Sequence, residues 1–230
     1  MDVILIPGLW LDASSWDEVL PPLVAAGHRT IVVESPGLGA PSNGGTGPGI
    51  ADWVGAVVAA IDGAEGPVVL VGHSGGANAA WGAADARPDL VARVVIVDAV
   101  PPHDGAPVNA FDVIDGVVPF PGWDFFDDED VFDLDAATRA RTARLARSVP
   151  AGVPHDPVAL RDARRFDIPV TLLMAGLDGA GVDAALADSP EHAAEYGAIV
   201  DREVTRIGSG HWPQFAVPQR LGELIAAAIR

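Results

Sequence analysis

Residues 68–76 read Val-Val-Leu-Val-Gly-His-Ser-Gly-Gly and give the clearest local signal in the chain. The apolar run 68–71 predicts a strand buried on both faces, and residues 76–86, which follow it in the sequence, predict a helix. Ser74 then lies on a sharp strand-to-helix turn, a strained geometry that requires small neighbours such as Gly72 and Gly76. The turn lifts the serine hydroxyl above the sheet edge. We predict that Ser74 is a nucleophile, the alternative being a Gly-rich turn with a capping serine.

Short β-branched runs alternate with helical stretches on both sides of this motif. Strands are expected at residues 3–6, 30–34, 68–71, 94–98, 170–174 and 202–206, and helices at 15–26, 50–61, 76–86 and 218–229. This alternation is typical of an α/β protein with a mostly parallel sheet of about six strands, covered by helices on both faces. We predict one domain over residues 1–230.

Residues 101–166 break the alternation, because they separate the fourth and fifth expected strands by far more than an ordinary loop. The segment holds several aromatic residues, then the acidic run Asp127 to Asp130, then an Arg-rich helical stretch over residues 136–147. Its aromatic content favours a packed lid over a site rather than a disordered loop. We interpret the acidic run as a solvated face or a helix start rather than a cation site.

The net charge of −18 restricts the partners that the protein can bind. All fourteen basic residues are arginines, and cysteine is absent. A surface this acidic repels phosphate backbones and anionic headgroups, so we expect a small-molecule substrate and neither nucleic acid nor membrane as partner. The absence of cysteine excludes disulfides and thiolate metal sites. The N-terminus shows no leader pattern, so we expect a cytoplasmic protein. We also expect a monomer or homodimer that uses neither a metal nor a cofactor.

The first strand and its surroundings carry a family likeness. The residues concerned are Gly8-Leu9-Trp10, Trp16, Leu23 and Ala26-Gly27-His28. With the serine turn, they make the chain resemble the α/β-hydrolase superfamily, and within it the small group of plant methylesterases, hydroxynitrile lyases and related bacterial esterases. The resemblance implies an α/β-hydrolase fold with a small lid insertion, and a sheet that lacks the two antiparallel edge strands of fuller members.

A serine hydroxyl needs a base, and the resemblance places that base in the loop before the last helix. His211 lies there, in Gly208-Ser209-Gly210-His211-Trp212-Pro213. We expect the histidines at 103, 155 and 192, which lie in polar stretches, to be solvated. The base needs an acid to orient it. Asp178, after the fifth strand, matches the family spacing and is preferred; Asp98, at the end of the fourth strand, is the rival.

The resemblance also implies the oxyanion donors. The backbone N–H groups of Gly75, after the nucleophile, and of Leu9, in the loop after the first strand, are expected to bind the oxyanion. An apolar substrate pocket is predicted from residues near the serine and from the aromatic residues of the insertion: Trp10, His73, Phe120, Trp123 and Trp212. The alternative for the aromatic side chains is that they belong to the hydrophobic core.

The chemistry expected from these residues is hydrolysis of a small neutral carboxylic ester or lactone through an acyl-enzyme on Ser74. Two alternatives remain open. A lyase or a cofactor-free oxygenase can use the same scaffold, although the plant-type hydroxynitrile lyases rely on a lysine and this chain has none. A non-catalytic binding protein is the second alternative, and such proteins often lose a member of the triad.

Overall fold

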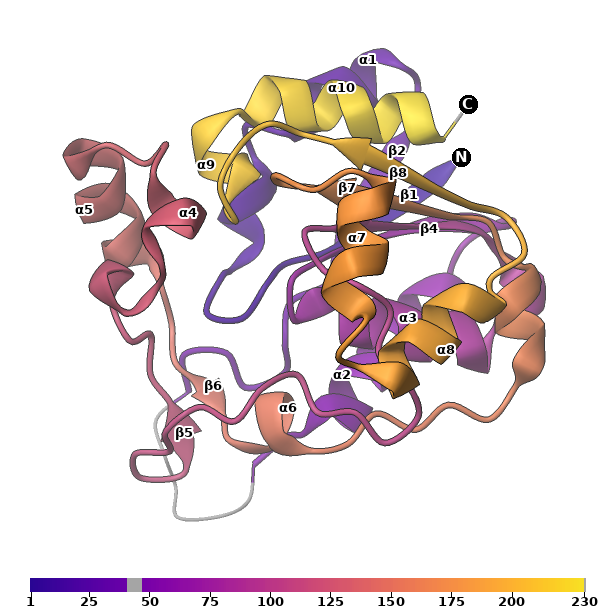
Figure 1. The fold of residues 1–230 in the computed structure, drawn as a ribbon, viewed down its shortest axis with the longest axis horizontal. Helices are drawn as coiled ribbons and strands as arrows, with labels where there is room; N and C mark the ends of the chain where they lie inside the picture. Colours follow the sequence, from indigo (N-terminus) through magenta and orange to yellow (C-terminus); the bar gives the residue numbers. More distant parts are fainter. Residues whose placement is uncertain (41–46, 230) are drawn as a thin grey trace.

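A six-stranded parallel sheet runs through the centre of the molecule (Figure 1). The computed structural model describes residues 1–40 and 47–229. In spatial order the strands are β2 (Arg29–Val32), β1 (Asp2–Ile6), β3 (Val68–His73), β4 (Val91–Val97), β7 (Val170–Met174) and β8 (Arg202–Arg206). Every neighbouring pair in this sheet is parallel, as the alternation of strands and helices predicted.

The period of two along each strand divides the apolar side chains between two cores. Ile4 of β1, Leu70 of β3 and Ile96 of β4 point into the core on one face. Leu5 and Val71, one residue further along their strands, point into the core on the other face. All of these side chains are buried, so the central strands are covered on both sides, as their continuous apolar sequence predicted.

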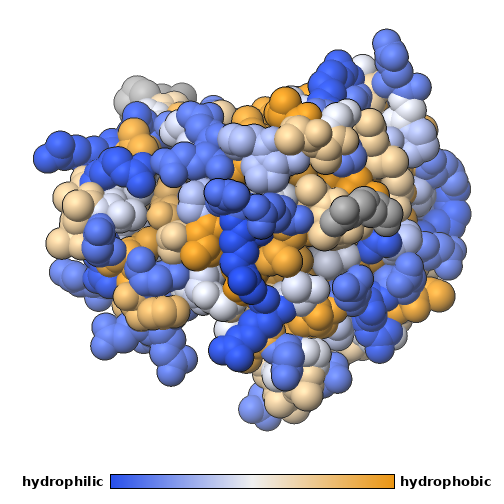
Figure 2. All heavy atoms as spheres, turned by 90° about the horizontal axis from the view of Figure 1, so that it is seen from above, coloured by the Kyte–Doolittle hydropathy of each residue, from blue (hydrophilic) through white to orange (hydrophobic). Residues whose placement is uncertain are grey.

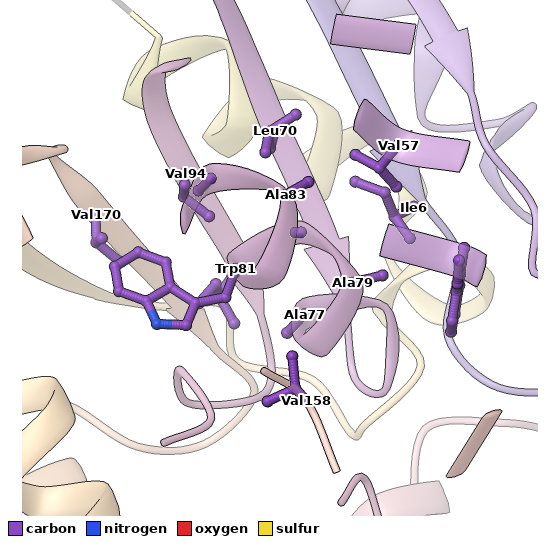
Figure 3. Close-up of a cluster of buried hydrophobic side chains, with 14 of the residues drawn as sticks. Ile6, Val57, Leu70, Ala77, Ala79, Trp81, Ala83, Val94, Val158 and Val170 are labelled. Carbon is purple, nitrogen blue, oxygen red and sulfur yellow. The ribbon is translucent and has the colours of Figure 1, made fainter. Parts of the chain in front are cut away.

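Helices cover the first core from one side of the sheet. They are α2 (Ile50–Asp62), α3 (Gly76–Ala86), α7 (Gly179–Leu186) and α8 (Pro190–Ala198). Figure 3 shows Trp81 and the small side chains of α3 packed among residues of the strands and Val57 of α2. The alanines on α3 allow this helix to approach the sheet closely. The sequence predicted α2 and α3 but neither α7 nor α8.

The opposite face of the sheet is covered by α1 (Leu20–Ala25) and α10 (Pro218–Ala228), which lie side by side in Figure 1. The helix expected over residues 15–26 is in fact a 3₁₀ turn, Ala13–Trp16, followed by α1. Pro21 and Pro22 lie in the first turn of α1, where a missing N–H costs nothing. Viewed from this side, hydrophilic residues cover much of the surface and apolar side chains lie between them (Figure 2).

The segment 101–166 between β4 and β7 is packed rather than extended. It contains the antiparallel pair β5 (Val117–Val118) and β6 (Val149–Pro150), and the helices α4 (Asp128–Val131), α5 (Ala136–Leu145) and α6 (Gly152–His155). It also contains a short 3₁₀ turn, Trp123–Phe125. Two further 3₁₀ turns lie before the segment, at Pro88–Leu90, and across its end, at Ala163–Asp167. The acidic run forms the start of α4, in agreement with its interpretation as a helix start. We call residues 101–166 the insertion.

Aromatic side chains join the insertion to the loops of the sheet domain. The indole of Trp123 meets that of Trp212 edge to face at 4.8 Å, and Val131 and Leu134 complete the cluster with Leu11. In Figure 1, α4 stands near α9 (Pro213–Ala216). Within the described ranges, no helix has the length and apolar character needed to cross a bilayer.

Candidate active site

Ser74 lies on a strained turn between β3 and α3. Its φ is 50°, in the left-handed region that side chains other than glycine rarely adopt. A methyl group on Gly72 would lie 2.8 Å from the Cα atom of Ala77, and one on Gly76 would lie 2.7 Å from the carbonyl oxygen of Ile6. Both contacts are too short for a real side chain. The two glycines are therefore required for α3 to begin directly above the end of β3.

His211 lies within hydrogen-bond distance of Ser74. Its Nε2 atom is 2.9 Å from the Ser74 Oγ, and its Nδ1 atom is 2.6 Å from the Oδ2 of Asp98. The carboxylate accepts the Nδ1–H, so Nε2 of the neutral ring is free to accept the serine proton. Serine, histidine and aspartate thus form a continuous chain of hydrogen bonds, although 137 residues separate Ser74 from His211.

The preference for Asp178 as the acid was wrong. Asp178 is exposed, and its Oδ1 atom accepts a hydrogen bond from the Gly181 N–H at 2.9 Å, which caps α7. Asp98 occupies the position that the sheet register favours, because Val97 pairs with His73 on β3 and with Leu173 on β7. The residue after β4 is thus the direct neighbour of the residue after β3. Asp98 also has a left-handed φ of 47°.

The surroundings of Asp98 stabilise its charged form. Burial acts to raise its pKa, but the hydrogen bond and charge of His211 and the Ala175 N–H, 2.7 Å from Oδ1, together hold the pKa below its usual value. Asp130 differs, since burial, together with the charges of Asp98 and Asp127, raises its pKa. The hydrogen bonds and the charge around Asp98 thus favour its carboxylate form beside the histidine.

Backbone contacts fix the loop that carries His211. The insertion supplies two of them: the His211 N–H donates to the Asp130 carbonyl at 2.8 Å, and the Gly210 N–H donates to the Asp133 carboxylate at 2.8 Å. A methyl group on Gly210 would collide with the Asp130 backbone. The sequence offered no signal for these contacts, because they join Asp130 of α4 and Asp133, which follows α4, to a loop about eighty residues later.

His73 supplies a third contact to the same loop. Its Nε2–H donates to the carbonyl oxygen of His211 at 2.8 Å, which assigns the tautomer because a carbonyl only accepts. The ring is fully buried and its Nδ1 faces Gly8 without a hydrogen-bond partner among the described residues. Burial, with the nearby His211, lowers the pKa of His73 to about 3. His73 is among the residues that line the cavity beside Ser74, as predicted, and its buried ring also supports the loop that carries His211.

Two backbone N–H groups near Ser74 are available to an oxyanion. Leu9 and Gly75 lie against each other, since a methyl group on Gly75 would be 2.9 Å from the Cγ of Leu9. In the part of the chain that the structure describes, neither N–H donates to another residue. Gly75 also precedes the first turn of α3, whose N-terminus carries partial positive charge. These are the two groups that the sequence predicted for this role.

A cavity of about 520 Å³ opens beside Ser74 and His211. Its volume is in the range typical of sites for small molecules. Its apolar wall includes Trp10, Phe111, Phe125, Phe126 and Trp212, and its polar rim includes Asn78, Asn109, Asp127, Asp130 and His192. Trp10 and Trp212 were predicted here. His192 was expected to be solvated, but it is half-buried at this rim, and its ring meets that of His103 at 4.6 Å.

Phe120 and Trp123 were predicted as pocket residues and do not line this cavity. Phe120 packs on the outer edge of Trp10, with ring centroids 5.8 Å apart, and Trp123 donates its indole N–H to the Arg139 carbonyl at 2.8 Å. Both therefore support the aromatic wall from behind. Among the described residues, no group of three or more histidine, aspartate or glutamate side chains is arranged to hold a metal ion.

Comparison with known proteins identifies the family of this chain. Residues 3–224 match the model of the alpha/beta hydrolase family. The chain belongs to this family. An 85-residue stretch is 39% identical to the lipase LipV of Mycobacterium tuberculosis (strain ATCC 25618 / H37Rv), and that match spans 34% of this chain and 32% of the lipase. This alpha/beta hydrolase therefore covers only about a third of that relative in sequence.

Solved structures share the fold of this hydrolase over nearly its whole length. An extracellular alpha/beta-hydrolase from a Paenibacillus species superposes with a TM-score of 0.76 at 21% identity, covering 100% of this chain and 97% of that one. A pyrethroid hydrolase from Sphingobium faniae JZ-2 gives 0.68 at 23% identity, covering 99% and 96%. The methylesterase MES16 from Arabidopsis gives 0.73 at 16% identity, covering 100% and 98%.

Proposed function

We propose that this hydrolase is a serine esterase that cleaves small neutral carboxylic esters or lactones through an acyl-enzyme on Ser74. The observation that carries the proposal is the chain of hydrogen bonds from Ser74 through His211 to Asp98, at 2.9 and 2.6 Å, beside a cavity large enough for a small molecule. A serine paired with a base that a carboxylate orients is the arrangement that acyl transfer requires.

In the first half of the reaction, Ser74 Oγ attacks the ester carbonyl as His211 Nε2 takes its proton. Asp98 holds the ring by Nδ1 and stabilises the imidazolium that forms. The carbonyl oxygen becomes an oxyanion, and the N–H groups of Leu9 and Gly75 are the donors proposed for it. The imidazolium then protonates the leaving alcohol, and the acyl group remains on Ser74.

In the second half, water replaces the alcohol and His211 removes its proton. Attack on the acyl-enzyme gives a second oxyanion at the same two N–H groups, and its collapse releases the acid and restores Ser74. The carboxylate product carries a negative charge within a protein of net charge −18, so its departure is favoured electrostatically. The same field favours neutral substrates over substrates that carry carboxylates.

The test is turnover of short-chain nitrophenyl esters by the natural protein and by Ser74→Ala. We expect the variant to lose at least about 10³ in kcat, because the nucleophile is gone while the oxyanion donors remain. A fluorophosphonate probe should label the natural protein on Ser74 and leave the variant unlabelled. Equal turnover by both proteins contradicts the acyl-enzyme. Release of cyanide from a cyanohydrin, without any ester turnover, would instead support the lyase alternative.

A further inference from the structure

A second cavity, of about 390 Å³, lies in the insertion next to the one that contains Ser74. Ile114, Val118, Pro119 and Pro121 line it together with Phe111 and Phe125, and Asp112 is the charged residue of its lining. We call it the outer groove. Phe111 and Phe125 also line the cavity beside Ser74, so these two side chains form a wall shared by both.

The shared wall consists of two rings that are not tightly packed against each other. The centroids of Phe111 and Phe125 are 6.1 Å apart, and 59% of the Phe125 side chain is exposed. The inner edge of Phe111 contacts Trp10, with centroids 4.9 Å apart. Phe111 and Phe125 thus form an aromatic boundary common to the Ser74 cavity and the outer groove, and Trp10 extends it on the Ser74 side.

Hydrogen bonds hold the floor of the outer groove in place. Ile114 and Val117 exchange two backbone hydrogen bonds, of 2.8 and 3.1 Å, around Asp115 and Gly116. Both of these turn residues have left-handed φ values, 49° and 79°, as a tight two-residue hairpin requires. Ile114 is thus fixed in position while 58% of its side chain stays exposed. The groove is formed before any ligand arrives, which lowers the entropy lost on binding.

We propose that the outer groove binds the apolar tail of an extended ester while the ester carbonyl lies at Ser74. The inference rests on the proposed function and specifies its substrate class: esters with a long alkyl or a bulky aromatic group on the acyl or the alcohol side. The shared wall of Phe111 and Phe125 carries the proposal, since it sets an apolar hollow directly beside the cavity that contains Ser74.

The charges around the groove argue against two other occupants. Asp112 and Asp115 flank Ile114, and Asp124 precedes Phe125, within a chain of net charge −18. A second copy of this chain would bring the same carboxylates into contact, and an anionic lipid surface would be repelled. The neutral tail of a substrate already held at Ser74 meets neither penalty.

The test compares Ile114→Glu with Val113→Glu in the full-length protein. Both side chains are exposed and apolar, and Val113 is absent from the groove lining, so the second variant is a matched control. Two series of esters are used: nitrophenyl acetate, butyrate, octanoate and decanoate, and acetates of alcohols of matching length. We expect kcat/KM of the natural protein to rise with length in at least one series.

Ile114→Glu should remove that rise, increasing KM for the longest ester about tenfold, because a charge replaces the apolar contact of the tail. Its turnover of nitrophenyl acetate should equal that of the natural protein, and Val113→Glu should behave like the natural protein throughout. Identical behaviour of the two variants, or the absence of any length preference in either series, overturns the outer-groove proposal. So does a change in sedimentation of Ile114→Glu with unchanged kinetics, which would assign the groove to an interface between copies.

The outcomes also separate this proposal from the function on which it rests. If hydrolysis of nitrophenyl acetate depends on Ser74 but Ile114→Glu leaves the length preference unchanged, the esterase proposal stands and the outer-groove proposal fails. Hydrolysis that persists in Ser74→Ala removes both.

Discussion

Asp98 lies 2.6 Å from His211, whereas Asp178, which the loop spacing favoured, lies at the start of α7 and caps it. The relationship follows from the sheet. β3 and β4 are neighbours in register, so the residues that follow them, Ser74 and Asp98, lie next to each other at the carboxyl edge. Both have left-handed φ values, which turn their side chains toward the imidazole.

Replacing Asp98 with asparagine should therefore disable the relay. Without the carboxylate, His211 no longer has a partner that fixes the Nδ1–H tautomer and stabilises the imidazolium, and kcat should fall by about 10⁴. Steady-state hydrolysis of nitrophenyl acetate measures this loss. Asp178→Asn is the matched control: asparagine also caps a helix, so both activity and stability should stay near those of the natural protein. Loss of activity in Asp178→Asn alone would restore the original preference.

The two aspartates show where prediction from the sequence ended. The strands of the sheet were predicted because their β-branched runs are local signals, and Ser74 and His211 because each lies in a distinctive glycine-rich loop. Both Asp98 and Asp178 satisfy the chain order of serine, acid and histidine. Choosing between them requires the register of three strands, and register is a relationship between segments that no local pattern contains.

The insertion shows the same limit more strongly. Its aromatic content indicated a packed segment, which is correct, but not which rings face the cavity. Phe120 and Trp123 lie behind Trp10 and Trp212, while Phe111, Phe125 and Phe126 face inward. These side chains come from irregular backbone and a single 3₁₀ turn, so neither a helical nor a strand period orients them.

His73 leads to a prediction about kcat. Because its Nε2–H holds the backbone carbonyl of His211, His73→Phe removes a donor and leaves that carbonyl without its partner. A small displacement of the imidazole from Ser74 should lower kcat by about 10- to 100-fold with little change in KM. In His73→Gln, the side-chain amide can place an N–H near the same point, and most of the activity should return.

Both His73 variants need thermal unfolding measured beside the kinetics, since the residue is buried. A positioning role predicts that kcat separates the glutamine from the phenylalanine variant more clearly than the Tm does. Full activity in His73→Phe, or a glutamine variant as slow as the phenylalanine variant, would contradict this role.

The same histidine should make stability depend on pH. In the folded protein its pKa is about 3, against 6.5 for a free histidine, so the unfolded chain binds a proton that the folded chain does not. The free energy of unfolding should therefore fall as the pH drops below about 6.5, by about 2 kcal/mol between pH 7 and pH 5. Urea unfolding at the two pH values measures this fall. For His73→Gln the free energy of unfolding should fall by about 2 kcal/mol less over the same pH interval. An equal fall in both proteins would exclude His73 as the source.

A buried ion network outside the lining of the cavity should govern stability without affecting catalysis. Arg165 donates to Glu195 at 2.7 and 3.0 Å and to Asp85 at 3.1 Å, and Glu195 also accepts the Trp81 indole N–H at 2.8 Å. Arg165, Asp85 and Glu195 are all buried, and none of them lines the Ser74 cavity. The network ties α3 and α8 to the 3₁₀ turn before β7.

Glu195→Ala removes one carboxylate and leaves the guanidinium with incomplete compensation and the indole without an acceptor. We expect the free energy of unfolding to fall by about 3–5 kcal/mol, because an unpaired buried charge is costly, while kcat/KM at a temperature well below Tm stays unchanged. Denaturant titration followed by the ester assay measures both. The control is Asp89→Ala, which breaks the exposed pair of Arg164 and Asp89, and it should leave stability unchanged within error. Equal effects of the two substitutions would mean that burial adds nothing to the Glu195 pair. Lost activity in a folded Glu195→Ala would connect the network to the site.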